Sequence, residues 1–161
     1  MSSTLTTEKS ATTRQPIPGG APRITDVQPY LFFGGRCDEA IEFYRRVLGA
    51  EVTMLMRFKD NPDGEGCGGV SVDGNKVMHA SIQIGNTTVL ASDGCEAQAS
   101  FQGFSLSLTF STIEDAERVY ASLSESGQIQ QPLTETFFAK RFGMVADKFG
   151  VSWMVVVMAQ Q

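Results

Sequence analysis

The sequence predicts an α+β fold of paired βαβββ modules, in which eight strands form a cupped mixed sheet with the helices on its outer face. Two observations support this fold. The order strand, helix, strand, strand, strand occurs twice, over about residues 27–93 and 104–158. Several of these strands alternate apolar and polar residues, which indicates one buried and one open sheet face. Because each module alone would leave one face uncovered, the two are expected to pair around a shared cavity.

The folded domain is expected to span residues 24–161. Residues 1–23 before it are polar, lack the apolar stretch of a secretory signal and end in a cluster of proline and glycine. A segment of this composition buries too little apolar surface to become ordered. We therefore expect it to be a disordered N-terminal tail.

The first module opens with an aromatic strand over residues 27–33. A helix over residues 37–48 follows, because the apolar residues recur with helical spacing and Gly49 ends the pattern. A second strand, a turn-rich and mobile loop, and two strands joined as a hairpin at Gly85 complete the module. These four segments are residues 51–58, 59–76, 78–85 and 87–93.

The second module repeats this order. Residues 104–110 alternate as a half-buried strand does. A helix over residues 111–127 follows, in which Ser111 and Glu114 have the spacing of a capping box and Gly127 ends the helix. The last three strands are expected at residues 129–136, 142–147 and 152–158.

The alternation also predicts which side chains face the cavity. In the strand over residues 78–85 the apolar side chains should meet a helix, which turns His79, Ser81 and Gln83 toward the open face. Small polar residues on a concave sheet face suggest a ligand pocket, and the alternative is a solvated sheet face in a monomer. In the second module the corresponding residues are Ser105, Ser107 and Thr109.

Charge and cysteine content narrow the class of protein. The net charge of −5 argues against nucleic acid or an anionic membrane as the main partner, since both need a basic surface. No apolar run approaches the length that crosses a bilayer. Cys37, Cys67 and Cys95 are widely spaced and odd in number. They are expected to be free thiols in a reducing cytoplasm.

Four segments in order resemble the PhnB-like branch of the vicinal oxygen chelate superfamily. They are PYLFFGGRCDEAIEFYRRVLGAEV, HASIQIGNTTVLASD, GFSLSLTF and ETFFAKRFGMVADKFGVSWMVVV, and together they cover Val27 to about Met158. The superfamily also holds glyoxalase I, extradiol dioxygenases, fosfomycin-resistance enzymes and bleomycin-binding proteins. The resemblance implies paired modules in a homodimer. Some sequences of this type are called ubiquinone-pathway methyltransferases, but no glycine-rich loop follows the first strand here to hold S-adenosylmethionine.

The resemblance also implies where a metal site would lie. Metal-using relatives hold one divalent ion with ligands on the first and last strands of each module. Such ions take carboxylate or imidazole groups, and the corresponding places in this chain offer neither. The usual metal site is therefore expected to be missing. The alternative is a divalent metal bound elsewhere in the cavity. The four places fall on Pro29, on Leu90 or Ser92, on Ser105 or Ser107, and on Met154.

A few residues are candidates for chemistry or binding. His79 is the only histidine, and it can act as a general base, with Asp93 to orient it or to act as an acid. The alternative for His79 is a structural hydrogen bond. Arg57 and Lys140 are candidates to bind an anionic group, although each can also be an ordinary surface cation. Aromatic stacking on a ligand is predicted for Phe137 and Trp153, whose alternative place is the core.

The sequence favours a protein that binds a small apolar or anionic molecule in the sheet cavity without the usual metal, as a cytoplasmic homodimer. The alternative is an enzyme of the lyase or isomerase type with His79 as general acid and base. A third reading is a pure dimerisation domain, which predicts no pocket. The predicted ligand-binding residues are Arg57, Ser81, Gln83, Ser105, Ser107, Phe137, Lys140 and Trp153.

Overall fold

The computed structural model describes residues 19, 20, 22–64 and 66–160. Most of the expected N-terminal tail, residues 1–18 and 21, lies outside the described residues. The helices and strands of the described part are, in chain order, β1 (Tyr30–Phe32), α1 (Cys37–Leu48), β2 (Glu51–Arg57), η1 (Phe58–Asp60), β3 (Val77–Ile84), β4 (Thr87–Ser92), β5 (Leu106–Thr109), α2 (Ile113–Ser124), β6 (Gln128–Thr134), β7 (Ala139–Ala146) and β8 (Ser152–Met158).

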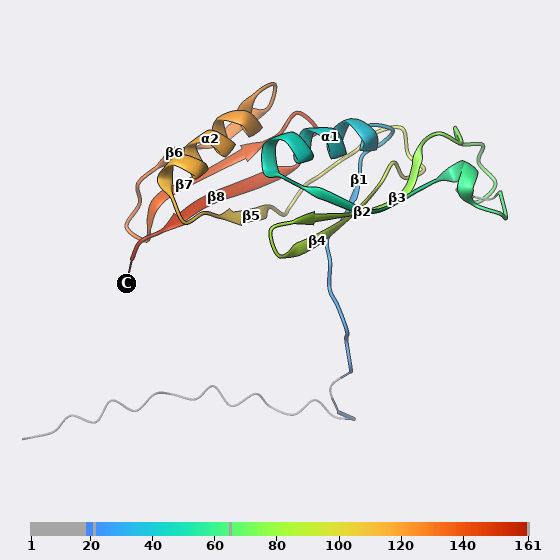
Figure 1. Cartoon of the computed structure of the whole chain (residues 1–161), viewed down its shortest axis with the longest axis horizontal. Helices are drawn as coiled ribbons and strands as arrows, with labels where there is room; N and C mark the ends of the chain where they lie inside the picture. Colours follow the sequence, from blue (N-terminus) through green and yellow to red (C-terminus); the bar gives the residue numbers. More distant parts are fainter. Residues whose placement is uncertain (1–18, 21, 65, 161) are drawn as a thin grey trace, which may run out of the picture.

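These elements form two βαβββ modules that lie side by side, with both helices on the same side of the sheets (Figure 1). Each module has a four-stranded mixed sheet, in the orders β1-β4-β3-β2 and β5-β8-β7-β6. In each sheet the first strand of the module pairs in parallel with the last, and the other pairs are antiparallel. The predicted α+β fold of paired modules is confirmed. Its eight strands form two separately hydrogen-bonded sheets in place of one continuous sheet.

The ends of α1 follow from its sequence. Asp38 and Glu39 lie in its first turn, where the helix dipole favours negative charge. Gly49 follows its last turn with a φ of 64°, a conformation that glycine adopts without steric cost, and donates its N–H to the carbonyl of Tyr44. The predicted helix of residues 37–48 is therefore confirmed at both ends.

The start of α2 differs by one residue from the prediction. Thr112, and not Ser111, is the N-cap, and its hydroxyl accepts a hydrogen bond from the backbone N–H of Asp115 at 3.2 Å. The helix ends at Ser124, earlier than the Gly127 that the sequence suggests. Both hydroxyl residues can cap a helix, so the sequence alone did not decide between them.

The starts of β1 and β7 differ most from the prediction, by three residues each. β1 covers only three residues, Tyr30–Phe32, although the carbonyl of Pro29 still accepts from the backbone N–H of Leu90 at 2.9 Å. β7 begins at Ala139, three residues earlier than expected. The reason is a tight turn closed by Thr136, whose hydroxyl and backbone N–H both hydrogen-bond to the backbone of Ala139.

The core lies between the helices and the helix-facing side of both sheets. In β3 the side chains of Ala80 and Ile82 are buried, whereas His79 and Ser81, which alternate with them, are only half-buried. This is the alternation that the sequence predicts. No helix in the described part of the chain is long and apolar enough to span a bilayer.

A buried carboxylate links the two modules. Asp147, in the turn between β7 and β8, accepts hydrogen bonds at one oxygen from the Tyr44 hydroxyl of α1 at 2.6 Å and from the Trp153 indole N–H at 2.8 Å. Its other oxygen accepts from the backbone N–H groups of Phe149 and Val151 at 2.9 and 3.1 Å. Burial, and then the negative charge of Asp147, raise the pKa of Tyr44 well above its usual value. The two modules therefore share one core.

Candidate functional site

The open side of the first sheet contains a cavity of about 440 Å³, which we call the module 1 pocket. It is lined by aromatic side chains of β1 and η1, by the polar end of β4 and by two loop segments. Its lining includes no Lys or Arg and is mainly apolar. The lining residues are Tyr30, Phe32, Gly34, Phe58, Gly66, Met78, Ser92, Asp93, Gly94, Cys95, Glu96 and Gln98.

Tyr30 lines the module 1 pocket and contacts both Phe32 and His79. The rings of Tyr30 and Phe32 are stacked, with centroids 4.9 Å apart and an interplanar angle of 26°. The Tyr30 hydroxyl lies 2.9 Å from Nδ1 of His79, so the two groups share a proton along a hydrogen bond. Partial burial raises the pKa of Tyr30, which keeps its hydroxyl protonated at neutral pH. The structure thus places His79 on the open face, with Tyr30 as its partner.

Sequence reasoning did not single out Tyr30 and Phe32 as site residues. They belong to the segment PYLFF, which the sequence identifies as part of a strand and of the family resemblance. Their spacing was a usable signal, because residues two apart on a strand share one face. Leu31 between them is 2% exposed, which marks the opposite face as the buried one.

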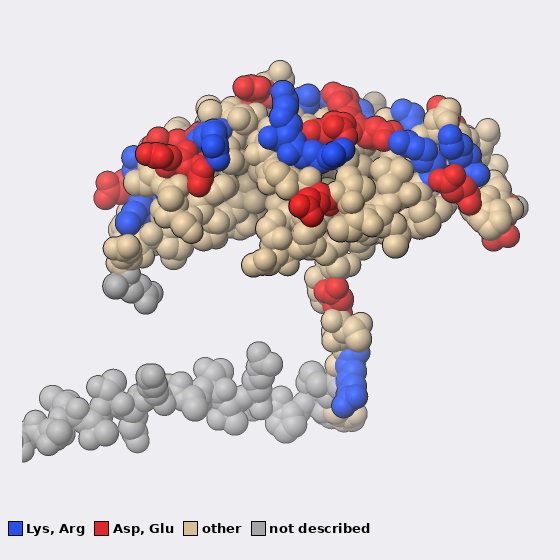
Figure 2. All heavy atoms as spheres, in the orientation of Figure 1, with Lys and Arg blue, Asp and Glu red and all other residues tan. Residues whose placement is uncertain are grey.

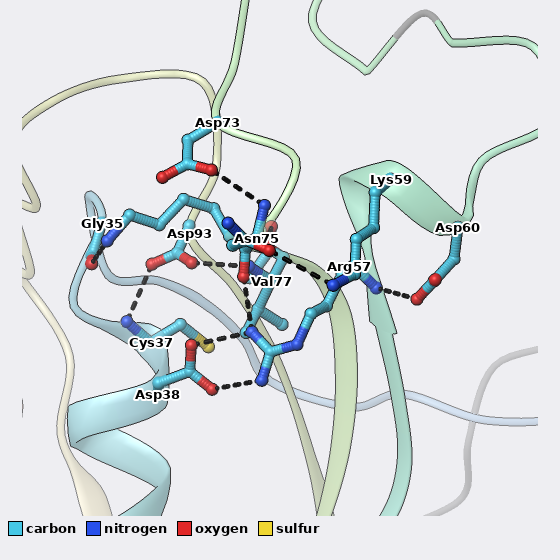
Figure 3. A network of polar contacts seen from close by, with 12 residues as sticks. Gly35, Cys37, Asp38, Arg57, Lys59, Asp60, Asp73, Asn75, Val77 and Asp93 are labelled. Carbon is cyan, nitrogen blue, oxygen red and sulfur yellow. Dashed lines mark hydrogen bonds and ion pairs between the residues drawn. The ribbon is translucent and has the colours of Figure 1, made fainter.

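Asp93 does not pair with His79, contrary to the role predicted for it. It is 3% exposed, and its two oxygens accept hydrogen bonds from the backbone N–H groups of Cys37 and Val77, at 2.8 and 2.7 Å (Figure 3). The carboxylate thus holds the first turn of α1 against the start of β3. A group with both oxygens engaged in this way is a structural acceptor.

Arg57 lies on the wrong side of the sheet to meet a ligand in the cavity. Its guanidinium forms a bidentate ion pair with Asp38 of α1, with both hydrogen bonds at 2.9 Å, and donates to the carbonyl of Asn75 (Figure 3). The ion pair lowers the pKa of Asp38. In this arrangement Arg57 does not line the module 1 pocket, and its guanidinium is occupied by Asp38.

Trp153 is a core residue. Its side chain is 1% exposed, donates to Asp147 and packs edge-on to the ring of Tyr44 at 5.4 Å. It cannot stack on a molecule bound at the open face. Its neighbour Met154 occupies the open face and lines a second cavity.

This second cavity, the module 2 pocket, has a volume of about 620 Å³ and lies on the open face of the second sheet. A chain of hydrogen bonds crosses its floor: the hydroxyls of Ser105 and Ser152 are 2.7 Å apart, and Ser152 donates to the Gln130 side chain at 2.8 Å. Ser105 is thus in a pocket, as predicted. Ser152 and Gln130, which belong to different strands, were not predicted because only the fold brings them to Ser105.

A third cavity of about 880 Å³ lies between the two modules. The end of α1, the β3–β4 turn, β5 and α2 line it. Ser107 borders this cleft and neither of the two sheet pockets. Ser105 and Ser107 therefore line different cavities, whereas the sequence predicts that they share one.

The remaining predicted ligand-binding residues line none of the three cavities. Ser81 is half-buried on the open face of β3. The Gln83 amide is used locally, donating to the Gly85 carbonyl and accepting from Thr88. Phe137 is 99% exposed and contacts the ring of Phe138, and Lys140 is half-buried on β7.

Two of the three cysteines are bonded to each other, which corrects the expectation of three free thiols. Cys67 and Cys95 form a disulfide, with Cα atoms 5.6 Å apart across 28 residues of sequence. Cys37 is a free and fully buried thiol, and burial raises its pKa far above the usual range. The pairing was not evident in the sequence because 28 residues separate the partners and only the folded loops bring them together.

The described residues include no group of three or more His, Cys, Asp or Glu side chains close enough to hold a metal ion. Of the places where relatives carry metal ligands, Ser92 lines the module 1 pocket, and Ser105 and Met154 line the module 2 pocket. Neither a hydroxyl nor a thioether is a good ligand for a hard divalent ion.

Comparison with known proteins agrees with this fold. A family model described as 3-demethylubiquinone-9 3-methyltransferase matches residues 25–156. Protein YjdN of Escherichia coli (strain K12) is 37% identical over 142 residues, which cover 84% of this chain and 97% of YjdN. The crystal structure of protein PA1353 from Pseudomonas aeruginosa is 36% identical with a TM-score of 0.71, and the match covers 84% of this chain and 100% of PA1353.

Two further structures connect the chain to a wider group. A Bacillus cereus structure described as a putative 3-demethylubiquinone-9 3-methyltransferase, PhnB protein, is 25% identical with a TM-score of 0.69, covering 83% of this chain and 99% of that one. A glyoxylase/bleomycin resistance protein/dioxygenase domain from Frankia sp. EAN1pec, 12% identical with a TM-score of 0.56, covers 87% and 100% and shows the shared fold alone. With its two βαβββ modules, the chain belongs to the PhnB-like branch of the vicinal oxygen chelate superfamily, the family whose model is described as 3-demethylubiquinone-9 3-methyltransferase.

Proposed function

We propose that this protein binds a small, mainly apolar or aromatic molecule in the module 1 pocket. The observation that carries the proposal is the stacked pair Tyr30 and Phe32 that lines that pocket, with the Tyr30 hydroxyl hydrogen-bonded to His79, which is not itself a lining residue. A volume of about 440 Å³ is within the range of small-molecule sites, which combine apolar walls with a few polar groups. Aromatic faces favour a flat ligand.

The charges around the module 1 pocket favour a neutral ligand over an anionic one. Its lining carries Asp93 and Glu96 and no cation. The arginine expected to bind an anion, Arg57, is ion-paired to Asp38 on the helix side. An anion in this pocket would lose water without gaining a positive partner, which is unfavourable.

Ligand binding without a divalent metal is part of the proposal. It is supported by the side chains at the places where relatives hold a metal, since Ser92, Ser105 and Met154 bring no carboxylate or imidazole. The methyltransferase description of the family model is not carried over to this chain. The mixed sheets in the orders β1-β4-β3-β2 and β5-β8-β7-β6 differ from a doubly wound parallel sheet.

Titration with the neutral dye Nile red tests this proposal. We expect binding with a Kd on the order of micromolar, weakened about tenfold by Phe32→Ala, because the variant removes a stacking face and its buried area. Phe137→Ala is the matched control: Phe137 is 99% exposed and outside the pocket, so its removal should leave the Kd unchanged. EDTA or added Mn²⁺ and Zn²⁺ should also leave it unchanged. Equal effects of both phenylalanine variants, or loss of binding in EDTA, would contradict the proposal.

Proton transfer is a second candidate function, favoured by the Tyr30–His79 hydrogen bond. In this reading Nδ1–H of His79 donates to the Tyr30 oxygen, 2.9 Å away, which fixes the orientation of the imidazole ring and leaves Nε2 free to take a proton from the bound molecule. His79→Gln tests this candidate through turnover, while the dye titration shows whether the pocket is intact. An enzyme of this kind keeps the dye affinity and loses turnover of its substrate, and unchanged turnover would contradict the proton-transfer role.

We also propose that a second copy of the chain covers the open sheet faces, and that this homodimer is cytoplasmic. Charged residues gather on the helix side of the molecule, and the sheet side in the same view is largely uncharged (Figure 2). Large apolar side chains on the sheet side stay exposed, a pattern typical of an interface. They include Phe32, Met54, Met56, Phe104 and Met158.

Light scattering coupled to size exclusion tests the dimer. The expected mass is twice the 17.5 kDa of one chain. Met54→Glu, which puts a charge on the open face, should shift the protein toward the monomer, because burying an unpaired carboxylate is costly. Glu42→Lys on the exposed side of α1 is the control and should leave the mass unchanged. A monomeric wild-type protein at high concentration would rule out the dimer.

A further inference from the structure

The disulfide lies beside the module 1 pocket. Cys95 lines the pocket directly, and so does Gly66, the neighbour of Cys67 in sequence. Gly66 packs so closely on the ring of Phe58, another lining residue, that a Cβ at this position would overlap the ring. The loop segment of residues 66–70 therefore reaches the pocket through Gly66, and the disulfide ties this segment to the one after β4.

The other end of this loop has its own anchors (Figure 3). Asn75 receives a hydrogen bond from Arg57 on its carbonyl and one from Lys59 on its side chain. The backbone of Gly74 accepts from Lys59, and Asp73 closes a turn onto Asn75. Residues 73–75 therefore stay in place whether or not the disulfide is formed.

Residues 66–70 have far fewer attachments. Within the described part of the chain, besides the disulfide and a contact of the Gly66 carbonyl with Cys95 Sγ at 3.8 Å, they have the packing of Gly66 on Phe58 and one local hydrogen bond, from the N–H of Val70 to the carbonyl of Cys67 at 3.1 Å. A turn that bonds only to itself does not hold a loop against the rest of the protein. The covalent bond to Cys95 is the main tie between this segment and the body of module 1.

The segment that carries Cys95 packs against β1 and the turn after it. Gly94 lies against the ring of Phe32, where a Cβ would come within 3.1 Å, and residues 98 and 99 lie so close to Gly34 that a Cβ there would be 2.8 Å from the backbone nitrogen of Ala99. The disulfide therefore joins a segment packed on the body of module 1 to a loop with few other contacts.

We propose that Cys67 and Cys95 form a redox-sensitive modification site that sets the shape of the module 1 pocket, with low-molecular-weight thiols such as glutathione as reductant. When the disulfide is formed, residues 66–70 close the side of the pocket. When it is reduced, they leave Phe58, and the pocket opens and binds its ligand less tightly. This inference rests on the proposed function, because it concerns the affinity of the same pocket.

The chemistry is a thiol–disulfide exchange. A thiolate attacks one sulfur of the Cys67–Cys95 bond, which breaks, forming a mixed disulfide and releasing the other cysteine as a thiolate that takes up a proton. A second thiolate attacks the mixed disulfide, so that both cysteines end as thiols and the two reductant molecules as their disulfide. Cys95 is exposed to solvent and accessible to such reagents. Cys37 is fully buried and takes no part.

Nile red titration of the same protein with and without dithiothreitol tests the inference. We expect one titratable thiol in the unfolded, unreduced protein and three after reduction, since Cys37 is free and the other two are paired. Reduction should raise the Kd about tenfold, because the ligand loses the contact area of one wall. Cys67→Ser/Cys95→Ser is the control variant, and it should show the weaker affinity under both conditions and no response to dithiothreitol.

Several outcomes would overturn the inference. Three free thiols before reduction would mean that the disulfide does not form. An unchanged Kd after full reduction would refute the inference and leave the proposed function intact. If the dye binds in neither state, the proposed function fails. Hydrogen exchange of residues 66–70 then tests separately whether reduction of the disulfide releases this segment. Exchange that is faster after reduction supports it, and unchanged exchange refutes it.

Discussion

Replacing Asp147 by asparagine is expected to lower the free energy of unfolding by roughly 3 kcal/mol. The side chain keeps its shape, but its amide nitrogen takes the place of the oxygen that accepts from Tyr44 and Trp153. The tyrosine hydroxyl can turn and become an acceptor, whereas the indole N–H has no such choice and is left buried without a partner. Because Tyr44 belongs to α1 and Asp147 to the second module, the loss should loosen the contact between the modules.

Urea denaturation of the variant measures this effect. Glu117→Gln is a suitable control: its carboxylate pairs with Arg141 at 3.2 Å on the surface, where an ion pair contributes little, so the change should be within about 0.5 kcal/mol. Tyr44→Phe removes one of the four donors and should cost about 1 kcal/mol. A stability of Asp147→Asn equal to that of the control would mean that the carboxylate network does not hold the modules together.

Replacing Asp93 by alanine should cost roughly 2–4 kcal/mol, because it leaves two buried backbone N–H groups unpaired. These groups belong to Cys37 at the start of α1 and to Val77 at the start of β3. The carboxylate also lies at the N-terminal end of α1, where the helix dipole favours a negative charge. The expected loss is therefore structural and does not depend on any ligand.

Thermal unfolding followed by circular dichroism checks this prediction. Asp38→Ala, in the first turn of α1 that Asp93 contacts, is the control. Its pair with Arg57 is half-exposed, so its removal should cost no more than about 1 kcal/mol. Nile red affinity, measured where both variants are folded, shows whether the loss of Asp93 also alters the module 1 pocket, which Asp93 lines. A stable Asp93→Ala protein with altered ligand chemistry would restore Asp93 as a functional residue.

Most of the fold was predictable because it depends on local patterns. Helical spacing and Gly49 set α1, and the alternation in the strand around Ala80 identified its buried face. The errors lie where two similar residues compete or where a turn is made by distant groups. Thr112 caps α2 in place of Ser111, and Thr136 brings β7 forward to Ala139.

The candidate site was less predictable, because a residue's neighbours across strands do not appear in the sequence. Alternation put His79 on the open face, but it could not show that Tyr30 and not Asp93 is its hydrogen-bond partner. For the same reason the sequence could not show that Arg57 pairs with Asp38 and that Trp153 lies in the core.

By itself the sequence determined the two βαβββ modules, the family and the lack of carboxylate or imidazole at the usual metal places. The modules follow from periodicity, and the family and the usual metal places follow from the resemblance of four segments to known sequences. Only the tertiary structure decided that Asp147 joins the modules, that Tyr30 and Phe32 form the pocket wall, and that Cys67 is bonded to Cys95. Each of these is a contact between residues far apart in the chain. The sequence specifies such contacts only through the packing of the whole core, which no local pattern records.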